Sequence, residues 1–201
     1  MKHALTIAAL ACTLSTAYAA PSYVGGNGGS FTPFAGMGLT YGGDQVSDTV
    51  PFENSSSSSL HGGALIDFRA GFEYQTLNSP WSFQVSLGYH VAKVAAKNGS
   101  LTFGRIPLEV LAHWDVSNSW RFGGGLRKAL SSKVHTSGLG DGYAQEQDYT
   151  SSIGIVVEAE TFFSPQLGLK LRAVSEKYKP QVGGKEIDGS HVGAIGVYYF
   201  K

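Results

Sequence analysis

The chain has almost no cysteine. Its single cysteine, Cys12, lies within the first 19 residues, so a chain cut after them has no thiol and forms no disulfide. No run of eighteen apolar residues is present, which excludes a transmembrane helix. Neither sign of charge is in excess, because Lys and Arg number 15 and Asp and Glu also number 15. This balance excludes a typical nucleic-acid-binding protein, which carries a basic excess.

Motifs for phosphate or metal binding are also missing. The Gly-rich stretch at 25–29 is not followed by the Lys-Ser/Thr pair of a phosphate-binding loop. The histidines are scattered without metal-ligand spacing, at His3, His61, His90, His113, His135 and His191. We therefore expect no cofactor and no metal.

The first residues have the features of a secretory signal peptide. Met1-Lys2-His3 is a short basic start, Ala4 to Leu14 is an apolar run, and Ala17-Tyr18-Ala19 is a small-x-small cleavage site. The apolar run is too short to span a bilayer. The alternative is a lipoprotein signal that uses Cys12, but Ala9-Leu10-Ala11 fits that pattern poorly.

Removal of the leader leaves a chain of one-domain size. We expect residues 1–19 to be cleaved, residues 20–29 to form a Gly-rich flexible segment, and residues 30–201 to form the domain. Roughly 180 residues suit a single domain. Loss of Lys2 lowers the 15 bases to fourteen against 15 acids, which is still close to neutrality.

Most of the remaining chain alternates apolar and polar residues with a period of two. In the segment from Trp81, for example, Phe83, Val85 and Leu87 alternate with Gln84, Ser86 and Gly88. Such alternation predicts β-strands. The expected strands are about 30–41, 63–75, 81–91, 101–114, 120–130, 149–163, 167–178 and 190–200. The sequence therefore predicts an all-β fold with eight antiparallel strands in up-and-down order.

The connections between these strands alternate in length. Short turns are expected at 77–80, 116–119 and 164–166, and longer loops at 42–62, 131–148 and 179–189, with a shorter connection at 95–100. Short turns at one end and long loops at the other are typical of a transmembrane β-barrel.

The charged side chains must then face the lumen. A closed barrel gives every backbone polar group a partner in hydrocarbon, and a base on the lipid face costs ~2–4 kcal/mol at mid-bilayer. We therefore expect apolar side chains outside and charged ones inside. The alternative is a soluble, lipocalin-like barrel with its apolar face inward, but its small lumen would be crowded by the large aromatic side chains.

Six acids and six bases are expected in the lumen, where buried charges require partners. They are Asp67, Arg69, Glu73, Arg105, Glu109, Arg121, Arg127, Glu158, Glu160, Lys170, Arg172 and Glu176. The tight turn at 164–166 places Glu160 opposite Lys170 and Glu158 opposite Arg172. An eight-stranded interior is just wide enough for side chains to fill it, so we expect a closed lumen.

Aromatic residues mark the strand ends near the short turns. We expect Tyr74, Trp81, Trp114, Trp120 and Phe163 to form an aromatic girdle at the membrane interface. The last strand ends in Val197-Tyr198-Tyr199-Phe200, followed by Lys201. A terminal aromatic residue with a second one two residues before it resembles the closing strand of bacterial outer-membrane β-barrels.

With these strand ends and tight hairpins, residues 30–200 resemble the small outer-membrane β-barrel proteins grouped with opacity-related surface antigens and the OmpA-type transmembrane barrel. We expect no periplasmic domain after the barrel. The resemblance implies a location in the bacterial outer membrane, with Tyr198 and Phe200 as the signal read by the barrel assembly machinery. It also implies contact with outer-membrane lipid and lipopolysaccharide. We expect a monomer without a nucleic-acid partner.

The resemblance implies a structural or surface-interaction role carried by external loops, and we expect no enzyme. The alternatives are an outer-membrane enzyme or lipid- or small-molecule-handling barrel that acts on lipopolysaccharide, and a narrow channel. Ser190 and His191 are adjacent and point to opposite faces, so they form no nucleophile–base pair. His90 and Asp67 can approach each other in the lumen, but Ser86 is the only inward nucleophile near them.

Overall fold

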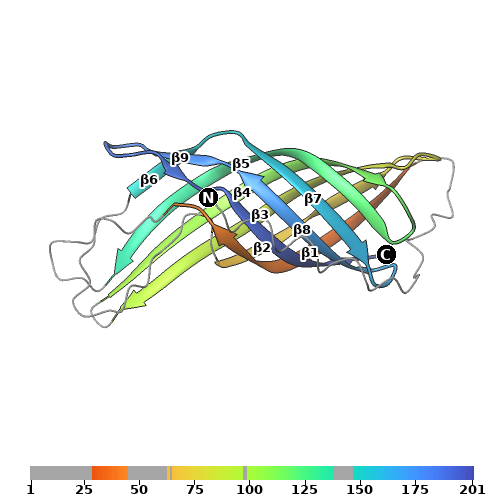
Figure 1. The fold of residues 1–201 in the computed structure, drawn as a ribbon, viewed down its shortest axis with the longest axis horizontal. Coiled ribbons are helices and arrows are strands. Elements are labelled where there is room, and N and C mark those ends of the chain that lie inside the picture. Colours follow the sequence, from red (N-terminus) through yellow and green to blue (C-terminus); the bar gives the residue numbers. More distant parts are fainter. Residues whose placement is uncertain (1–28, 45–62, 64, 97–98, 138–146) are drawn as a thin grey trace, which may run out of the picture.

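The computed structural model describes residues 29–44, 63, 65–96, 99–137 and 147–201 (Figure 1). The signal peptide expected at 1–19, and the Gly-rich segment expected at 20–29 except for its last residue, lie outside the described residues. The described part of the chain contains strands and turns but no helix. None of it therefore forms a helix long and apolar enough to cross a membrane.

Eight antiparallel strands form a closed ring, which confirms the expected fold. They are β1 (Ser30–Gly42), β2 (Leu65–Gln75), β3 (Trp81–Ala96), β4 (Gly99–Asp115), β5 (Trp120–Ser137), β7 (Gly154–Phe162), β8 (Leu167–Ser175) and β11 (His191–Tyr199). The order around the wall is β5-β4-β3-β2-β1-β11-β8-β7, and β7 pairs with β5 to close it.

The first and last strands of the ring are neighbours. β1 pairs with β11 from Phe34 opposite Tyr199 to Gly42 opposite His191. Three tight connections lie at one end of the barrel, between β2 and β3, β4 and β5, and β7 and β8. We call this the turn end, and the opposite end the loop end. The C-terminus lies at the turn end (Figure 1).

Three short strands extend the wall beyond the ring at the loop end: β6 (Gln147–Ser151), β9 (Lys177–Pro180) and β10 (Ile187–Asp188). The single strand expected over 149–163 is therefore two strands, β6 and β7. The strand expected over 167–178 is likewise divided into β8 and β9. The division arises because β6 pairs with β9 above the ring, whereas β7 pairs with β8 inside it.

The break between β6 and β7 is bridged by one side chain. The Ser151 hydroxyl accepts a hydrogen bond from Ala129 N at 3.0 Å and donates one to Ala129 O at 3.1 Å. Hydrogen bonds to a side-chain hydroxyl thus replace backbone–backbone hydrogen bonds at the point where the pairing of β5 with β7 stops. This keeps the edge of β5 satisfied between its pairing with β7 and its pairing with β6.

The loop expected at 131–148 is shorter than predicted. β5 continues to Ser137 and β6 begins at Gln147. The register of β5 against β4 shifts beside Pro107, where a bulge inserts an extra residue and reverses the alternation of faces. The connections expected at 95–100 and 179–189 also contain strand residues.

The wall has an apolar outside and an ionic inside. On β4, Leu108 and Val110 are exposed, whereas Glu109 and His113 are buried. The same alternation places large apolar side chains outward around the whole ring. This arrangement is the reverse of a soluble barrel, in which the apolar face is buried.

Three apolar clusters inside the barrel were not expected. One lies at the turn end and contains Phe34, Phe162, Ile195, Val197 and Tyr199. A second, at the loop end, contains Ala92, Phe103, Ala129, Val134 and Tyr178. Leu111, Val156 and Val174 form a smaller cluster. The lumen is therefore filled by apolar groups as well as by charges.

Candidate functional site: the charged lumen

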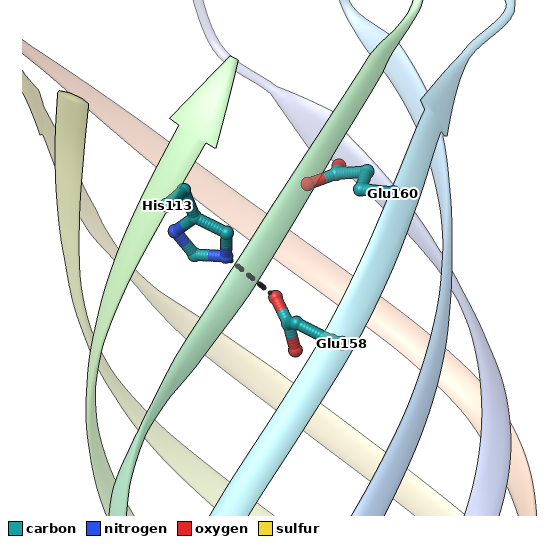
Figure 2. A group of neighbouring side chains, drawn as sticks. All are labelled: His113, Glu158 and Glu160. Atoms are coloured by element: carbon teal, nitrogen blue, oxygen red, sulfur yellow. Dashed lines mark hydrogen bonds and ion pairs between the residues drawn. The ribbon is translucent and has the colours of Figure 1, made fainter. Parts of the chain in front are cut away.

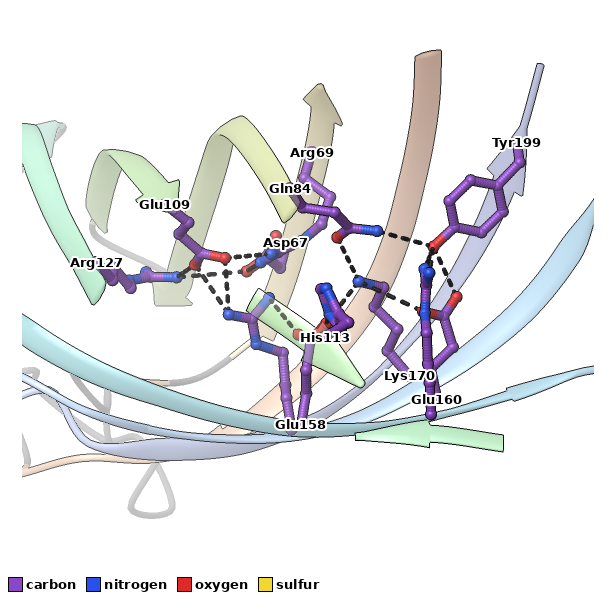
Figure 3. Close-up of polar contacts among 12 residues, drawn as sticks. Asp67, Arg69, Gln84, Glu109, His113, Arg127, Glu158, Glu160, Lys170 and Tyr199 are labelled. Carbon is purple, nitrogen blue, oxygen red and sulfur yellow. Dashed lines mark hydrogen bonds and ion pairs between the residues drawn. The ribbon is translucent and has the colours of Figure 1, made fainter. Parts of the chain in front are cut away.

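All twelve charged residues expected in the lumen are buried in the structure: Asp67, Arg69, Glu73, Arg105, Glu109, Arg121, Arg127, Glu158, Glu160, Lys170, Arg172 and Glu176. They project from several strands because each occupies an inward position of the alternation. Figure 3 shows how several of these side chains meet in the interior, among them those of Arg69, Glu109 and Lys170. Six acids and six bases leave the set without a formal net charge.

Glu109 on β4 is the centre of this network. Its carboxylate accepts hydrogen bonds from Arg69 at 2.6 Å, from Arg127 at 2.7 Å and from Arg172 at 2.8 and 2.9 Å. These arginines lie on β2, β5 and β8, so one acid connects four strands of the wall. Charge-assisted contacts of this length are the strongest class of protein hydrogen bond.

Nearer the loop end, Arg127 joins two further acids. Its Nε atom donates to Glu176 at 3.0 Å, and its Nη1 atom lies 3.8 Å from Asp67. Asp67 also accepts from Arg69 at 2.7 Å. The acids and bases here alternate in space, so each buried charge lies beside one of opposite sign.

Lys170 connects the centre to the turn end. Its ammonium group lies 2.5 Å from Glu158, 2.7 Å from the Gln84 side-chain oxygen and 3.6 Å from Glu160. The expected register is present, with Glu160 opposite Lys170 and Glu158 opposite Arg172. The shortest ion pairs are nevertheless different, because Lys170 lies nearer Glu158 and Arg172 lies nearer Glu109 than Glu158, 3.9 Å away.

Arg121 organises the turn end. It contacts Glu73 at 2.7 Å and Glu160 at 2.8 Å, and it donates to the Tyr199 hydroxyl at 2.5 Å. Tyr199 donates in turn to Glu160 at 2.8 Å, and Gln84 donates to Glu73 at 2.5 Å.

Three further members of the network were not selected from the sequence: Gln84, His113 and Tyr199. The alternation of the sequence could have identified them, because it places each of them on the inward face of its strand. Gln84 and His113 occupy inward positions on their strands, and Tyr199 lies between the outward Tyr198 and Phe200.

Near each end of the lumen, an arginine lies over two aromatic rings. Arg105 lies 4.8 Å from the Phe103 ring centre and 5.7 Å from that of Tyr178 at the loop end. Arg121 lies 4.9 Å from the Phe162 ring centre and 5.4 Å from that of Tyr199 at the turn end. Cation–π contacts of this kind are stronger when desolvated, so the two plugs combine packing with charge.

One group in the lumen has the composition of a metal site. His113, Glu158 and Glu160 offer ligand atoms that lie within 4.8 Å of one another (Figure 2). His113 Nε2 is 2.7 Å from Glu158, however, and the same carboxylate oxygen lies 2.5 Å from the Lys170 ammonium. The charge that a metal would supply is already provided by the protein, so this group fits a salt-bridge cluster better than a metal centre.

The residues weighed for catalysis do not assemble a nucleophile–base pair. His90 lies opposite Asp67 in register, but its Nε2 atom is hydrogen-bonded to the Thr40 hydroxyl at 2.8 Å. Ser86 and His90 are both described, and no hydrogen bond joins them. His191 is buried inside the barrel and contacts Gly189 O at 2.8 Å.

A polar cavity of about 250 Å³ lies at the turn end. Its lining includes Glu73, Asp115, Arg121 and Lys201. Arg121 and Glu73 already form an ion pair there. The cavity therefore lies beside the turn-end plug, since Arg121 and Phe162 are part of its lining.

The residues expected in the aromatic girdle lie at strand ends of the turn end. Trp81 and Trp114 face each other in register and stack at 5.7 Å between ring centres. Tyr74 packs on Phe31 at 4.8 Å, and Phe163 is exposed while Trp120 is half-buried. On the last strand, the exposed rings of Tyr198 and Phe200 contact each other edge-on at 5.1 Å.

No protein-family model matches the sequence, and no curated protein matches it. The structure is similar to the crystal structure of Neisserial surface protein A, with a TM-score of 0.55, 14% identity, and coverage of 86% of this chain and 99% of that chain. It is also similar to Ail, the attachment invasion locus protein of Yersinia pestis, solved with the heparin analogue sucrose octasulfate. Here the TM-score is 0.53 at 11% identity, and the match covers 85% of this chain and 97% of Ail. The chain therefore has the fold of the small eight-stranded outer-membrane β-barrels.

Proposed function

We propose that this protein is an integral barrel of the bacterial outer membrane with a structural or surface-interaction role. The observation that supports this proposal most directly is that the wall is the reverse of a soluble barrel. Its apolar side chains lie outside, and twelve charged residues are buried inside. A soluble protein rarely exposes such a large continuous apolar surface. In a bilayer the same surface is solvated by acyl chains, and the closed ring leaves no unpaired strand edge.

The lumen supports a rigid, non-conducting barrel. Cross-lumen contacts such as Arg172 to Glu109 join strands that are not neighbours in the wall. The aromatic plugs around Arg105 and Arg121 close the two ends. In this proposal the barrel acts as a monomer without a cofactor or catalysis, and the loops beyond the strands carry any contacts with other molecules.

The proposed route to the membrane is secretion, removal of residues 1–19 and insertion by the barrel assembly machinery. Tyr198 and Phe200 lie on the outer face, where another protein can read them during assembly. Replacement of Phe200 by Ala is expected to reduce the amount of barrel assembled in cells while leaving unaided folding into lipid vesicles nearly intact. Equal losses in both assays would contradict a role in targeting.

The orientation of the wall can be tested with single cysteines in a Cys12→Ser background. Leu108 and Leu111 lie on the same strand, but Leu108 is 37% exposed and Leu111 only 2%. A cysteine at Leu108 should react with a membrane-dissolved maleimide, whereas one at Leu111 should not. Val182, in the turn after β9, provides the control that reacts with a water-soluble maleimide. The proposal is wrong if the Leu108 variant reacts with the water-soluble reagent as fast as the Val182 variant.

Membrane fractionation with a heat-modifiability gel tests the location. The full chain should be recovered with outer membranes and should migrate differently before and after boiling. Recovery in the soluble periplasmic fraction would favour the lipocalin-like alternative.

The two alternative functions, a narrow channel and an enzyme, would give results that differ from those expected of a structural barrel. A narrow channel would show steady conductance in planar bilayers, which the plugs around Arg105 and Arg121 should prevent. An enzyme acting on lipopolysaccharide would release acyl chains from it in detergent, and we expect no release.

A further inference from the structure

The polar cavity at the turn end has a buried floor and an exposed rim. Its volume is about 250 Å³, whereas a single water needs roughly 10–15 Å³ of such space. The cavity therefore has room for a molecule of several heavy atoms. The floor includes the buried Thr32, Glu73, Arg121 and Phe162, and the rim includes the exposed Asn78 and Lys201. A ligand can thus enter from the solvent at the turn end.

The base in the floor of the cavity is already engaged by the protein. Arg121 donates from Nε to Glu160 at 2.8 Å, and its Nη1 atom lies 2.7 Å from Glu73. Its Nη2 atom donates to the Tyr199 hydroxyl at 2.5 Å. Because each nitrogen of the guanidinium group has a partner, the groups that remain for a ligand in the floor are acceptors.

Three oxygen-bearing side chains around the cavity keep this acceptor capacity. Glu73 uses Oε2 for both Arg121 and Gln84, and its Oε1 atom has no hydrogen-bond partner among the described residues. Thr32 lies opposite Glu73 in register and is 6% exposed, and its hydroxyl also has no partner in the described part of the chain. Asp115 forms no ion pair within those residues, and partial burial raises the pKa of its carboxyl. A buried polar group without a partner costs free energy, so the arrangement favours a ligand with several N–H donors.

These acceptors suit an ammonium group better than a metal ion. Among the described residues, one group of three His, Asp or Glu side chains has its ligand atoms close enough for a metal, and neither Glu73 nor Asp115 belongs to it. A primary ammonium group carries one positive charge and three N–H donors. It can therefore contact acceptors that are spread around a cavity.

Lys201 on the rim indicates what the rest of the ligand carries. The charged side chains of the lining are two acids, Glu73 and Asp115, and two bases, Arg121 and Lys201, so they have no formal net charge. A simple ammonium ion would leave an excess positive charge in the cavity, whereas a zwitterion would not. Lys201 is exposed and has no ion-pair partner among the described residues, so its own ammonium group is available for an anionic group of the ligand.

We propose that the turn-end cavity binds a small zwitterion with a primary ammonium group, such as a free amino acid. The ammonium group lies toward Glu73, Asp115 and Thr32, and the anionic group lies beside Lys201. Phe162 provides an apolar wall for the carbon atoms between them. The inference goes beyond the proposed function, because this cavity lies at the end with the short turns (Figure 1) and not among the loops. Short turns of outer-membrane barrels are periplasmic, so the ligand would come from the periplasm.

Glycine is the probe for this site. Equilibrium dialysis of radiolabelled glycine against the full mature protein, refolded in detergent micelles, measures its binding. Asp115→Asn and Thr32→Val should each weaken binding about tenfold, because each removes a partner of a charged group. Lys201→Gln should weaken it by roughly two- to fivefold, as expected for an exposed ion pair. The matched control is Asp148→Asn at the loop end, where Asp148 pairs with Lys133 on the surface, and it should leave binding unchanged.

Two analogues separate the two halves of the zwitterion. Methylamine has the ammonium group without a carboxylate, so its binding should fall with Asp115→Asn but not with Lys201→Gln. Trimethylglycine has both charges but no N–H donor, so it should bind about tenfold more weakly than glycine.

Three results would overturn the proposal: the absence of saturable glycine binding, binding that neither Asp115→Asn nor Thr32→Val weakens, and equal binding of trimethylglycine and glycine. Displacement of glycine by phosphatidylethanolamine, but not by phosphatidylcholine, would overturn the assignment to a free solute in favour of a lipid headgroup. A heat-modifiable band reports that each variant is folded. Loss of that band in the unmodified protein would contradict the proposed function, whereas its presence without glycine binding would contradict only the turn-end site.

Discussion

Arg172 on β8 donates through one nitrogen atom to both carboxylate oxygens of Glu109 on β4, at 2.9 and 2.8 Å. Two strands, β5 and β7, separate β4 from β8 along the wall. The contact therefore crosses the lumen. It ties opposite parts of the ring together across the interior.

The first prediction concerns the partner of Arg172. A double-mutant cycle with Arg172→Met and Glu109→Gln should give a larger coupling energy than a cycle with Arg172→Met and Glu158→Gln. The reason is distance, because Glu109 is 2.8 Å from Arg172 and Glu158 is 3.9 Å away. Urea unfolding in lipid vesicles measures both cycles. Equal couplings would mean that the cross-lumen contact is no stronger than the contact between adjacent strands.

The second prediction concerns Glu109 alone. Glu109→Gln leaves three arginines around a neutral amide, and breaking a buried ion pair in this way costs about 3–5 kcal/mol of unfolding free energy. Glu186→Gln is the control, because Glu186 pairs with Lys177 at 3.0 Å on the exposed surface. Exposed pairs contribute about 0–1 kcal/mol. If the two variants unfold at the same urea concentration, Glu109 is not the centre of the network.

The third prediction uses two neighbouring tyrosines. Tyr199 is 2% exposed and its hydroxyl contacts Arg121 and Glu160, whereas Tyr198 is 42% exposed on the outer face. Tyr199→Phe leaves buried charged groups short of a partner and should cost about 1–3 kcal/mol. Tyr198→Phe should be nearly neutral. Thermal unfolding followed by gel mobility compares the two variants. If Tyr198→Phe lowered the stability more than Tyr199→Phe, the last strand would have Tyr198 facing the lumen and Tyr199 facing outward.

The fourth prediction uses two neighbouring glycines. A Cβ atom at Gly123 would overlap the His113 ring inside the lumen, whereas one at Gly124 would meet nothing closer than Val156 O at 3.6 Å. Gly123→Ala should therefore destabilise the barrel by about 1–3 kcal/mol through overpacking. Gly124→Ala should be tolerated. A stable Gly123→Ala protein that also keeps the His113–Glu158 hydrogen bond in a solved structure would contradict this account.

The fifth prediction concerns pH. Asp115 lies at the turn end outside the apolar band, and partial burial raises the pKa of its carboxyl above the usual 3.8. Because the folded state holds this proton more tightly, ionised Asp115 destabilises the fold above its pKa, and the penalty disappears below pH 3.8, where both states are protonated. Asp115→Asn should thus be more stable than the unmodified protein at pH 7, with a difference that shrinks as the pH falls toward 3.8. A difference that is constant with pH would exclude titration of Asp115 as its cause.

Strand positions and facing could be predicted because they depend on local geometry. The period of two along β4 separates Leu108 from Glu109 whatever the partner strands are. The tight turn after β7 sets the register that places Glu158 opposite Arg172. Each of these features depends only on one strand or on one hairpin, and not on the rest of the barrel.

The division of two strands and the partners inside the lumen could not be predicted in this way. Ser151 bridges to Ala129 where β5 passes from its pairing with β7 to its pairing with β6, and β6 is held there by β9, a segment distant in the chain. Glu109 meets Arg172 only after the ring has closed with a particular tilt and stagger. The alternation of the sequence thus specified which side chains face inward, whereas closure of the barrel selected the carboxylate that each arginine contacts, because strands three positions apart along the wall are brought together only across its interior.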